Sequence, residues 1–287
     1  MNIPPFWARE RLTDTDENGR TETFTACGWS FHSLEQARSE AKSRARRIFD
    51  LLTSGQKPKA YEYGDRPIRE EIADSIDIGS DQPVIITRNR YGALVLNTPS
   101  VFFADVDFPQ PVPGGFVEAM LWLFMPGRKE TRRQNLREHT LSRIDAWSIR
   151  NPDHRFRLYR THSGLRLLFI DRLYEPGSEE VSRILTELGS DPLYKKLTEK
   201  QKCYRARLTA KPWRCGVGLP PSSFPWDDSE SEQSCRRWET KYTDVCQGFT
   251  TCVLTEKYSA NSNHPVVGHV VRIHDQWACQ DSSLPFA

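Results

Sequence analysis

The sequence lacks an apolar run long enough to cross a membrane. The longest one, at 116–125, is interrupted by Glu118, whereas a transmembrane helix needs about 20 consecutive apolar residues. The first ten residues also lack the basic stretch and the apolar stretch of a secretory signal. We therefore expect no membrane partner, and we expect the chain to work in the cytoplasm.

The sequence also lacks an excess of charge of one sign, and it lacks closely spaced cysteines. The 287 residues carry 40 basic and 38 acidic side chains, so the formal net charge of +2 indicates no particular partner. The seven cysteines lie far apart and form no CxxC pair, which argues against a disulfide framework and against a zinc ribbon. Most of them are expected to be reduced thiols in the core.

What the sequence does contain is enough apolar material for a folded core. Hydrophobic residues make up 37% of the chain and aromatic residues 11%, too much for a disordered protein. Strand patterns and helical patterns alternate, so we expect an α/β or α+β protein with a mixed central sheet and flanking helices. Three parts are expected: an N-terminal strand–helix module with an acidic connection, a central sheet module and a C-terminal extension, at 1–82, 83–215 and 216–287.

Local patterns predict the order of the elements. The N-terminal module has a strand, a helix with a capping box at Ser33 and Gln36, and a short helix, at 20–31, 34–52 and 68–76. The central module has three strands, a long helix, a hairpin and a helix ended by Gly189, at 84–87, 93–96, 101–107, 129–150, 155–170 and 181–188. The extension has a helix, a strand and a last helix, at 235–246, 249–254 and from 265 onward. The apolar segment at 109–127 is interrupted by Pro and Gly and is assigned no regular element.

Two aspartates end the third central strand. In Asp105-Val106-Asp107, strand alternation places both carboxylates on one face of the sheet. Two aligned carboxylates can hold Mg²⁺ or Mn²⁺ together with substrate phosphates, and a pair of such ions serves nucleotidyl transfer. Short acidic motifs also arise as structural caps before a turn, so both interpretations stay open.

The elements that follow this motif resemble the catalytic half of the archaeo-eukaryotic primase superfamily, which includes primase-polymerases. The resemblance covers residues 101–171: a strand with DxD, a helix, and a hairpin whose turn is Thr161-His162-Ser163-Gly164-Leu165-Arg166, where the family has a TxSGGxGxH-like hairpin. It implies that Asp105 and Asp107 bind Mg²⁺ or Mn²⁺ and that Ser163 and Gly164 approach nucleotide phosphates. It also implies nucleotides, and single-stranded nucleic acid, as partners.

The family's histidine has no counterpart directly after this turn. Arg166 stands there instead; it suits bidentate binding of a triphosphate but cannot replace a titratable imidazole. His274 is the first candidate for the missing imidazole and His162 the second. Asp275 and Asp171 compete for the role of third acid. The alternative function is therefore a non-catalytic nucleic-acid or protein interaction module that kept the fold and lost the chemistry.

A basic segment follows the hairpin at 195–214, with eight Lys or Arg residues and one acidic residue. Its cations Arg205, Arg207 and Lys211 are interleaved with aromatic residues, a composition that suits phosphates and stacked bases. A solvated strand edge has the same composition, so this interpretation stays open too. Three histidines spaced by five residues near the C-terminus cannot share one helix face, which makes a zinc site from these three alone improbable.

Overall fold

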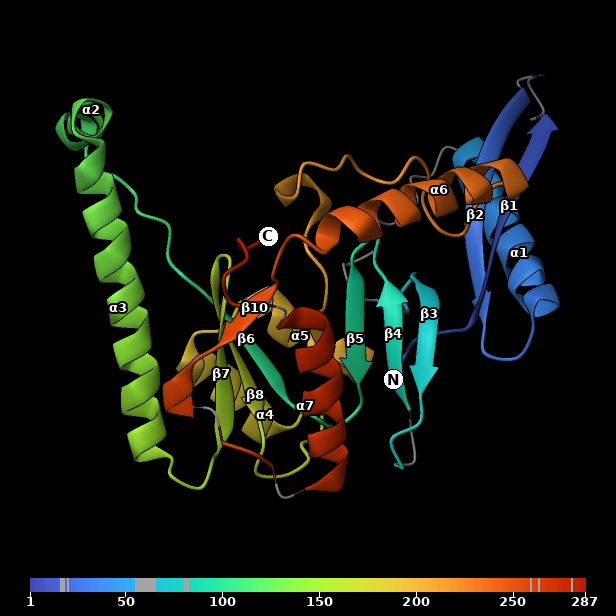
Figure 1. Ribbon diagram of the computed structural model, residues 1–287. Coiled ribbons are helices and arrows are strands. Elements are labelled where there is room, and N and C mark those ends of the chain that lie inside the picture. Colours follow the sequence, from blue (N-terminus) through green and yellow to red (C-terminus); the bar gives the residue numbers. More distant parts are fainter. Residues whose placement is uncertain are drawn as a thin grey trace.

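The computed structural model describes residues 1–15, 19, 21–54, 66–79, 83–258, 260–262, 264–279 and 281–287. It has α+β architecture, which confirms the expected fold class (Figure 1). The described strands form three sheets with the orders β1-β2, β3-β4-β5-β9 and β10-β7-β8-β6. Every pairing between these strands is antiparallel.

A two-stranded hairpin covered by one helix forms the N-terminal part. Strand β2 (Thr21–Ser30) confirms the expected strand and pairs with β1 (Phe6–Thr15), for which no element was predicted. Helix α1 (Leu34–Thr53) is confirmed, and the side chain of Ser33 accepts from the backbone N–H of Gln36. The helix packs closely on the hairpin at Gly28, where an added Cβ would lie 2.2 Å from the carbonyl oxygen of Ala37.

The second sheet corrects one prediction. The short helix expected at 68–76 is wrong, because residues 71–76 form strand β3 (Glu71–Ile76) beside β4 (Val84–Arg88). Pairing with a buried neighbour outweighs the weak local helical pattern. The sheet is completed by β5 (Leu94–Thr98) and β9 (Tyr204–Arg207), so it joins strands from both sides of the boundary expected at 82/83. Of the acidic connection expected up to residue 82, residues 56–65 and 80–82 lie outside the described residues.

The third sheet contains the predicted hairpin. Strands β7 (Phe156–Thr161) and β8 (Gly164–Phe169) form it, β6 (Phe103–Asp107) pairs with β8, and β10 (Cys252–Leu254) pairs with β7. Helices α4 (Glu179–Leu188) and α5 (Pro192–Gln201) lead from β8 to β9. The hydroxyl of Tyr194 on α5 lies 2.9 Å from the carbonyl oxygen of Phe103 and 3.4 Å from that of Arg205. One side chain therefore connects β6 to β9.

Helices cover both faces of this sheet. Trp147 on the confirmed long helix α3 (Pro126–Arg150) packs against Phe156 and Phe169 on one face. His274 on the confirmed last helix α7 (Pro265–Ala278) packs against Tyr159 on the other face. Helix α6 (Ser229–Cys246) extends across the top of the second sheet toward the N-terminal hairpin (Figure 1).

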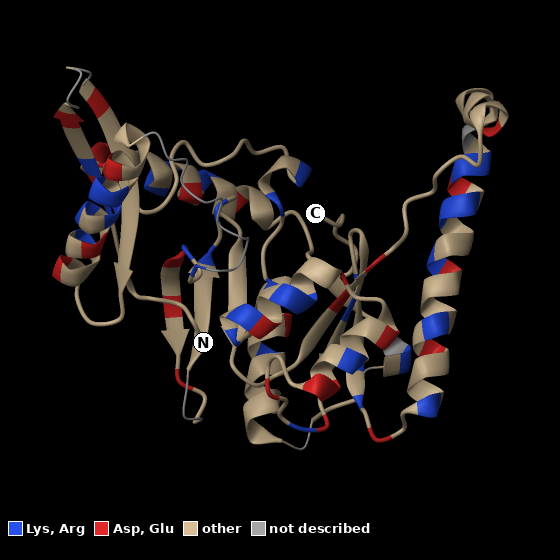
Figure 2. Cartoon of the chain, turned by 180° about the vertical axis from the view of Figure 1, so that it is seen from behind, with Lys and Arg blue, Asp and Glu red and all other residues tan. Residues whose placement is uncertain are grey.

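Helix α2 (Phe116–Phe124) was not predicted from the sequence, and it stands at the far end of α3 (Figure 1). Its apolar side chains face solvent: Phe116 is 81% exposed and Leu123 is 80% exposed. Lys and Arg residues recur along α3 below it (Figure 2). In the part of the chain that the structure describes, no helix combines the length and the apolar character needed to span a membrane.

Candidate functional site at the end of strand β6

The two aspartates of the DxD motif lie on the same face of β6 but have different surroundings. In the ladder with β8, Asp105 is opposite Arg166 and Asp107 is opposite Gly164. The guanidinium of Arg166 donates from Nε to Oδ1 of Asp105 at 2.8 Å and from Nη2 to Oδ2 at 3.2 Å. Both oxygens of Asp105 are therefore engaged, whereas Asp107 is exposed at the strand end.

Arg166 is held by more than this ion pair. Its side chain is only 4% exposed, and Nη1 donates to the carbonyl oxygen of Arg207 at 2.9 Å. Burial acts to lower the pKa of Arg166, but the charge and hydrogen bonds of Asp105 outweigh it and raise the pKa. Arg166 therefore stays charged and fixes Asp105 in place, which differs from the triphosphate-binding role inferred from its position after the turn.

A further acid stands beside Asp107. Although the residue as a whole is exposed, partial burial of the carboxyl group of Asp107 raises its pKa. The charges of Asp105 and Asp191 add to this rise, and those of Lys211 and Arg214 act against it. Asp191 is the N-cap of α5, and its side chain accepts from the backbone N–H of Leu193 at 2.9 Å. Asp191 was not among the predicted site residues, although its place before Pro192 marks a helix start. It is the acid that the fold brings near the DxD motif.

Cations surround the same strand end. Burial and the charges of Arg207 and Arg214 lower the pKa of Lys211. Burial, with the charges of Arg166 and Arg214, lowers the pKa of Arg207 to about 10. Burial is the larger cause of both shifts, and repulsion among the neighbouring positive charges, which a bound anion would relieve, adds to it.

The hairpin turn lies within this group of cations. Arg214 donates from Nη2 to Oγ of Ser163 at 2.8 Å, and Oγ lies 2.9 Å from Nδ1 of His162. Burial and the charges of Arg214, Arg207, Lys211 and Arg137 lower the pKa of His162, so its imidazole is neutral at pH 7.

Gly164 is required where the turn meets β6. A Cβ at this position would lie 2.2 Å from the carbonyl oxygen of Val106, a backbone atom that cannot move without opening the ladder. The carbonyl oxygen of Ser163 accepts from the backbone N–H of Phe108 at 2.9 Å. The turn is thus fixed against the end of β6.

Several predicted site residues lie elsewhere. Asp171 follows the far end of β8, where the hydroxyl of Tyr174 donates to it at 2.6 Å. His274 is buried beneath the sheet, and its Nδ1 lies 3.0 Å from Oδ1 of Asp275. Arg205 forms an ion pair with Glu70 rather than joining the cations near Asp107. Neither candidate third acid therefore reaches the DxD motif.

Asp105, Asp107 and Asp191, the three acids near the end of β6, differ in whether their oxygens are free to bind Mg²⁺ or Mn²⁺. Asp107 and Asp191 offer the hard oxygen ligands that these ions take, whereas Arg166 occupies both oxygens of Asp105. Within the described residues, the carboxylates do not assemble three ligand atoms within 4.8 Å of one another. Asp107 and Asp191 therefore keep carboxylate oxygens that Arg166 does not occupy.

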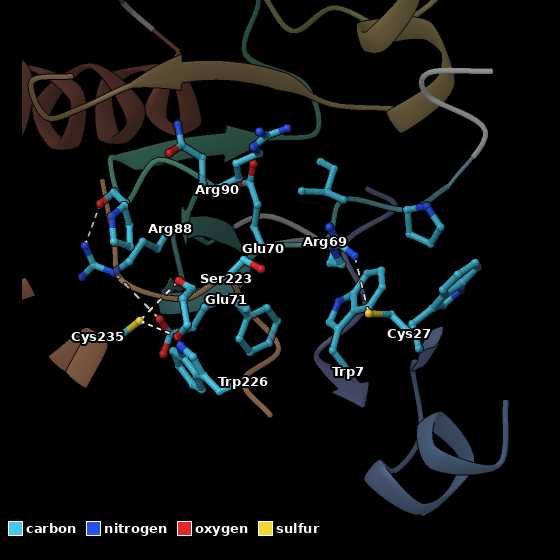
Figure 3. Close-up of a pocket in the computed structure, with 18 of the residues that line it drawn as sticks. Trp7, Cys27, Arg69, Glu70, Glu71, Arg88, Arg90, Ser223, Trp226 and Cys235 are labelled. Carbon is cyan, nitrogen blue, oxygen red and sulfur yellow. Dashed lines mark hydrogen bonds and ion pairs between the residues drawn. The ribbon is translucent and has the colours of Figure 1, made fainter. Parts of the chain in front are cut away.

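A separate cavity of about 650 Å³ lies between the N-terminal hairpin, β3, β4 and α6. Figure 3 shows Trp7 and Trp226 on its walls and Arg88 directed toward the acids of the cavity. Nε of Arg88 lies 3.1 Å from Oε1 of Glu239, and Arg205 on the wall pairs with Glu70. Arg88 and Arg205 are thus paired with acids, and the cavity is also lined by Arg66, Arg69 and Arg90 together with its aromatic faces.

Comparisons with family models, with curated proteins and with solved structures find no match to this chain. Function is therefore inferred from the residues at the end of β6.

Proposed function

We propose that the chain binds the phosphate groups of a nucleotide or of single-stranded nucleic acid at the end of β6, as a primase-polymerase-like module. The observation that carries this proposal is the placement of Lys211 and Arg214 beside Asp107 and the Ser163 turn. Cations and hydroxyls at a turn are typical phosphate ligands. Asp107 and Asp191 would hold Mg²⁺ or Mn²⁺, which neutralises phosphate charge when bound.

The topology around the site supports this proposal. Strand β6, helices α2 and α3, hairpin β7–β8, helices α4 and α5, and strand β9 follow one another in the chain. Asp107 lies directly opposite the turn residue Gly164. In the primase-polymerase resemblance, the DxD strand and the hairpin turn act on the same phosphates. Their adjacency across one ladder is the arrangement that such a role requires.

The form that we favour is binding without nucleotidyl transfer. A cation shared by both aspartates needs free oxygens on Asp105, and the bidentate pair with Arg166 occupies them. The second candidate is metal-dependent nucleotidyl transfer, which the acid Asp191 favours, since its charge and that of Asp105 add to the effect of burial in raising the pKa of Asp107. Primer extension with Mn²⁺ distinguishes the two forms: extension lost in Asp107→Asn supports transfer, and binding without extension supports the form we favour.

The test of binding is fluorescence anisotropy with a labelled single-stranded oligonucleotide and with a labelled nucleoside triphosphate. The double variant Lys211→Ala/Arg214→Ala should bind at least one of these probes about 30-fold more weakly than the wild type, since each of the two charged phosphate contacts contributes about 1 kcal/mol or more. The control is Arg38→Ala/Lys42→Ala, which removes the same charge from exposed positions on α1. Equal losses in both variants, or no binding by the wild type at low salt, would contradict the proposal.

We place this function in the cytoplasm. All seven cysteines of the chain are free thiols, and five are buried. Free thiols are typical of a reducing compartment, where nucleotides are also abundant.

A further inference from the structure

We propose that Cys252, His274 and Cys279 form a binding site for one thiolate-selecting divalent metal ion of the zinc class. This site is separate from the phosphate site and does not depend on the proposed function. Sγ of Cys252 lies 3.2 Å from Sγ of Cys279 and 3.9 Å from Nε2 of His274. All three ligand atoms lie within 4.8 Å of one another. Among the described residues, this is the group of three His, Cys, Asp or Glu side chains whose ligand atoms lie this close together.

The distances fit a tetrahedral ion. Zinc lies about 2.3 Å from sulfur and about 2.0–2.1 Å from imidazole nitrogen, so ligand atoms around one ion are about 3.5–3.8 Å apart. The observed separations of 3.2 and 3.9 Å lie on either side of this range. Shifts of a few tenths of an ångström would bring these two pairs to the expected separations, and the third pair, Cys279 and His274, has its ligand atoms within 4.8 Å of each other.

The ends of two elements bring the ligands together. Cys252 begins β10, and His274 lies on the last turn and a half of α7. Residues five apart on a continuous helix point in directions about 140° apart. Cys279, however, is the C-cap of α7 with φ −106° and ψ 73°, so the chain has already left the helix there. Because the backbone at Cys279 is no longer helical, the Cys279 side chain can lie on the same side of α7 as His274.

The hydrogen bonds around His274 select the tautomer that a metal requires. Nη1 of Arg166 lies 3.4 Å from Nε2 of His274, and a guanidinium only donates. Nε2 therefore presents its lone pair, which an ion would take in place of the Arg166 contact, and Nδ1 carries the proton that it donates to Oδ1 of Asp275 at 3.0 Å. A carboxylate behind the far nitrogen of the ring is the usual support of a metal-binding histidine.

Asp275 is itself fixed in position. The hydroxyl of Tyr159 donates to its Oδ1 at 2.8 Å, and Nη2 of Arg157 lies 3.2 Å from its Oδ2. The outer support of the site is thus present before any ion binds.

The ligands indicate the class of metal. Two thiolates and an imidazole favour zinc-like ions over Mg²⁺ and Mn²⁺, which prefer oxygen ligands. Two thiolates also compensate the charge of a divalent ion, which allows the ion to lie near the buried cation Arg166. Cys252 and His274 are buried and Cys279 is half-buried, so solvent reaches the site from the side of Cys279. The ion would fasten β10 and α7 together over the sheet, and with three protein ligands its fourth position would be open to water from the side of Cys279.

The test measures metal content and the spectrum of the cobalt form in the full chain, purified with its thiols reduced. We expect about one zinc per chain by elemental analysis. We expect Co²⁺ added to the metal-free protein to give a thiolate-to-cobalt charge-transfer band and the visible bands of a tetrahedral ion. The Cys279→Ser variant should lose most of the metal and weaken the charge-transfer band, whereas Cys27→Ser, which removes a half-buried thiol on β2, should retain both.

A positioning variant keeps the proposal testable if Cys279→Ser unfolds, which circular dichroism would report. Asp275→Asn retains all three ligands and should weaken metal affinity by about 10- to 100-fold. A reduced wild type that binds neither zinc nor Co²⁺ stoichiometrically would overturn the proposal. So would a cobalt spectrum without a thiolate band, or an equal loss of metal in Cys27→Ser.

Discussion

Arg166 and Asp105 form a bidentate ion pair across the β6–β8 ladder, and the two partners differ sharply in burial. The side chain of Arg166 is 4% exposed and that of Asp105 is 38% exposed. Water can hydrate the carboxylate when its partner is removed, but it cannot reach the guanidinium. The two halves of one interaction should therefore respond differently to substitution.

Asp105→Ala is expected to lower the free energy of unfolding by about 3 kcal/mol, because it leaves the buried charge of Arg166 without its partner. Arg166→Met should lower it by only about 1–2 kcal/mol, because the carboxylate that remains is accessible to solvent. Urea denaturation of both variants measures the difference. A larger loss in Arg166→Met than in Asp105→Ala would contradict this assignment.

The salt dependence of single-strand binding should distinguish the basic residues. Lys211 and Arg214 lie beside Asp107, whereas Arg205 is paired with Glu70. We expect Lys211→Ala and Arg214→Ala each to reduce the slope of log affinity against log salt by about 0.7, the value for one phosphate contact on a single strand. Arg205→Ala should leave the slope unchanged. Titrations at several salt concentrations provide the measurement, and equal slopes in all three variants would argue against a localised phosphate site.

Binding of a phosphodiester should strengthen as the pH falls, through His162. Burial and the neighbouring cations lower the pKa of His162 in the free protein. A bound phosphate would oppose those cations and raise this pKa, so protons are taken up on binding and affinity rises between about pH 7.5 and pH 5.5. An oligonucleotide without a terminal phosphate avoids titration of the ligand itself. His162→Gln should lack the increase; an unchanged pH profile in that variant would exclude His162 as its source.

Gly164→Ala should loosen the junction between the turn and β6. The added methyl group would meet the carbonyl oxygen of Val106, so the ladder must separate opposite Asp107. We expect a loss of about 1–3 kcal/mol in the free energy of unfolding, typical of overpacking against fixed atoms. Gly218→Ala is the matched control, since no atom lies within 4 Å of its added Cβ. Thermal unfolding of both variants gives the comparison; equal melting temperatures would contradict the close approach at Gly164.

Periodicity and turn signals predicted much of the fold because they act within one element. The alternation at 155–170 gave the hairpin, and Gly189, with φ +67°, ends α4 where a left-handed residue was expected. The failure at 71–76 has a different origin, since only the presence of β4 makes that segment a strand.

The candidate sites were harder to predict from the sequence, because they too depend on contacts between elements that are far apart in the chain. Asp191 is 84 residues from Asp107 in the numbering, and Cys252 is 27 residues from Cys279. No local spacing relates the members of either pair. Arg205 and Arg207, only two residues apart, were assigned one role, yet one pairs with Glu70 and the other donates to the carbonyl oxygen of Thr209.

Helix α2 affects the tendency of the protein to associate without contributing to the stability of its fold. It stands at the end of α3, a helix of 25 residues and thus about 38 Å long, and its side chains Phe116 and Leu123 remain in water. Apolar surface that stays hydrated contributes almost nothing to folding, but it is the first surface that a neighbouring molecule meets. Conformational stability therefore depends on buried residues such as Trp147, while colloidal stability depends on the exposed side chains of α2 at the end of α3. Replacing Phe116 and Leu123 with polar residues would therefore make the protein less prone to associate and would leave its melting temperature unchanged.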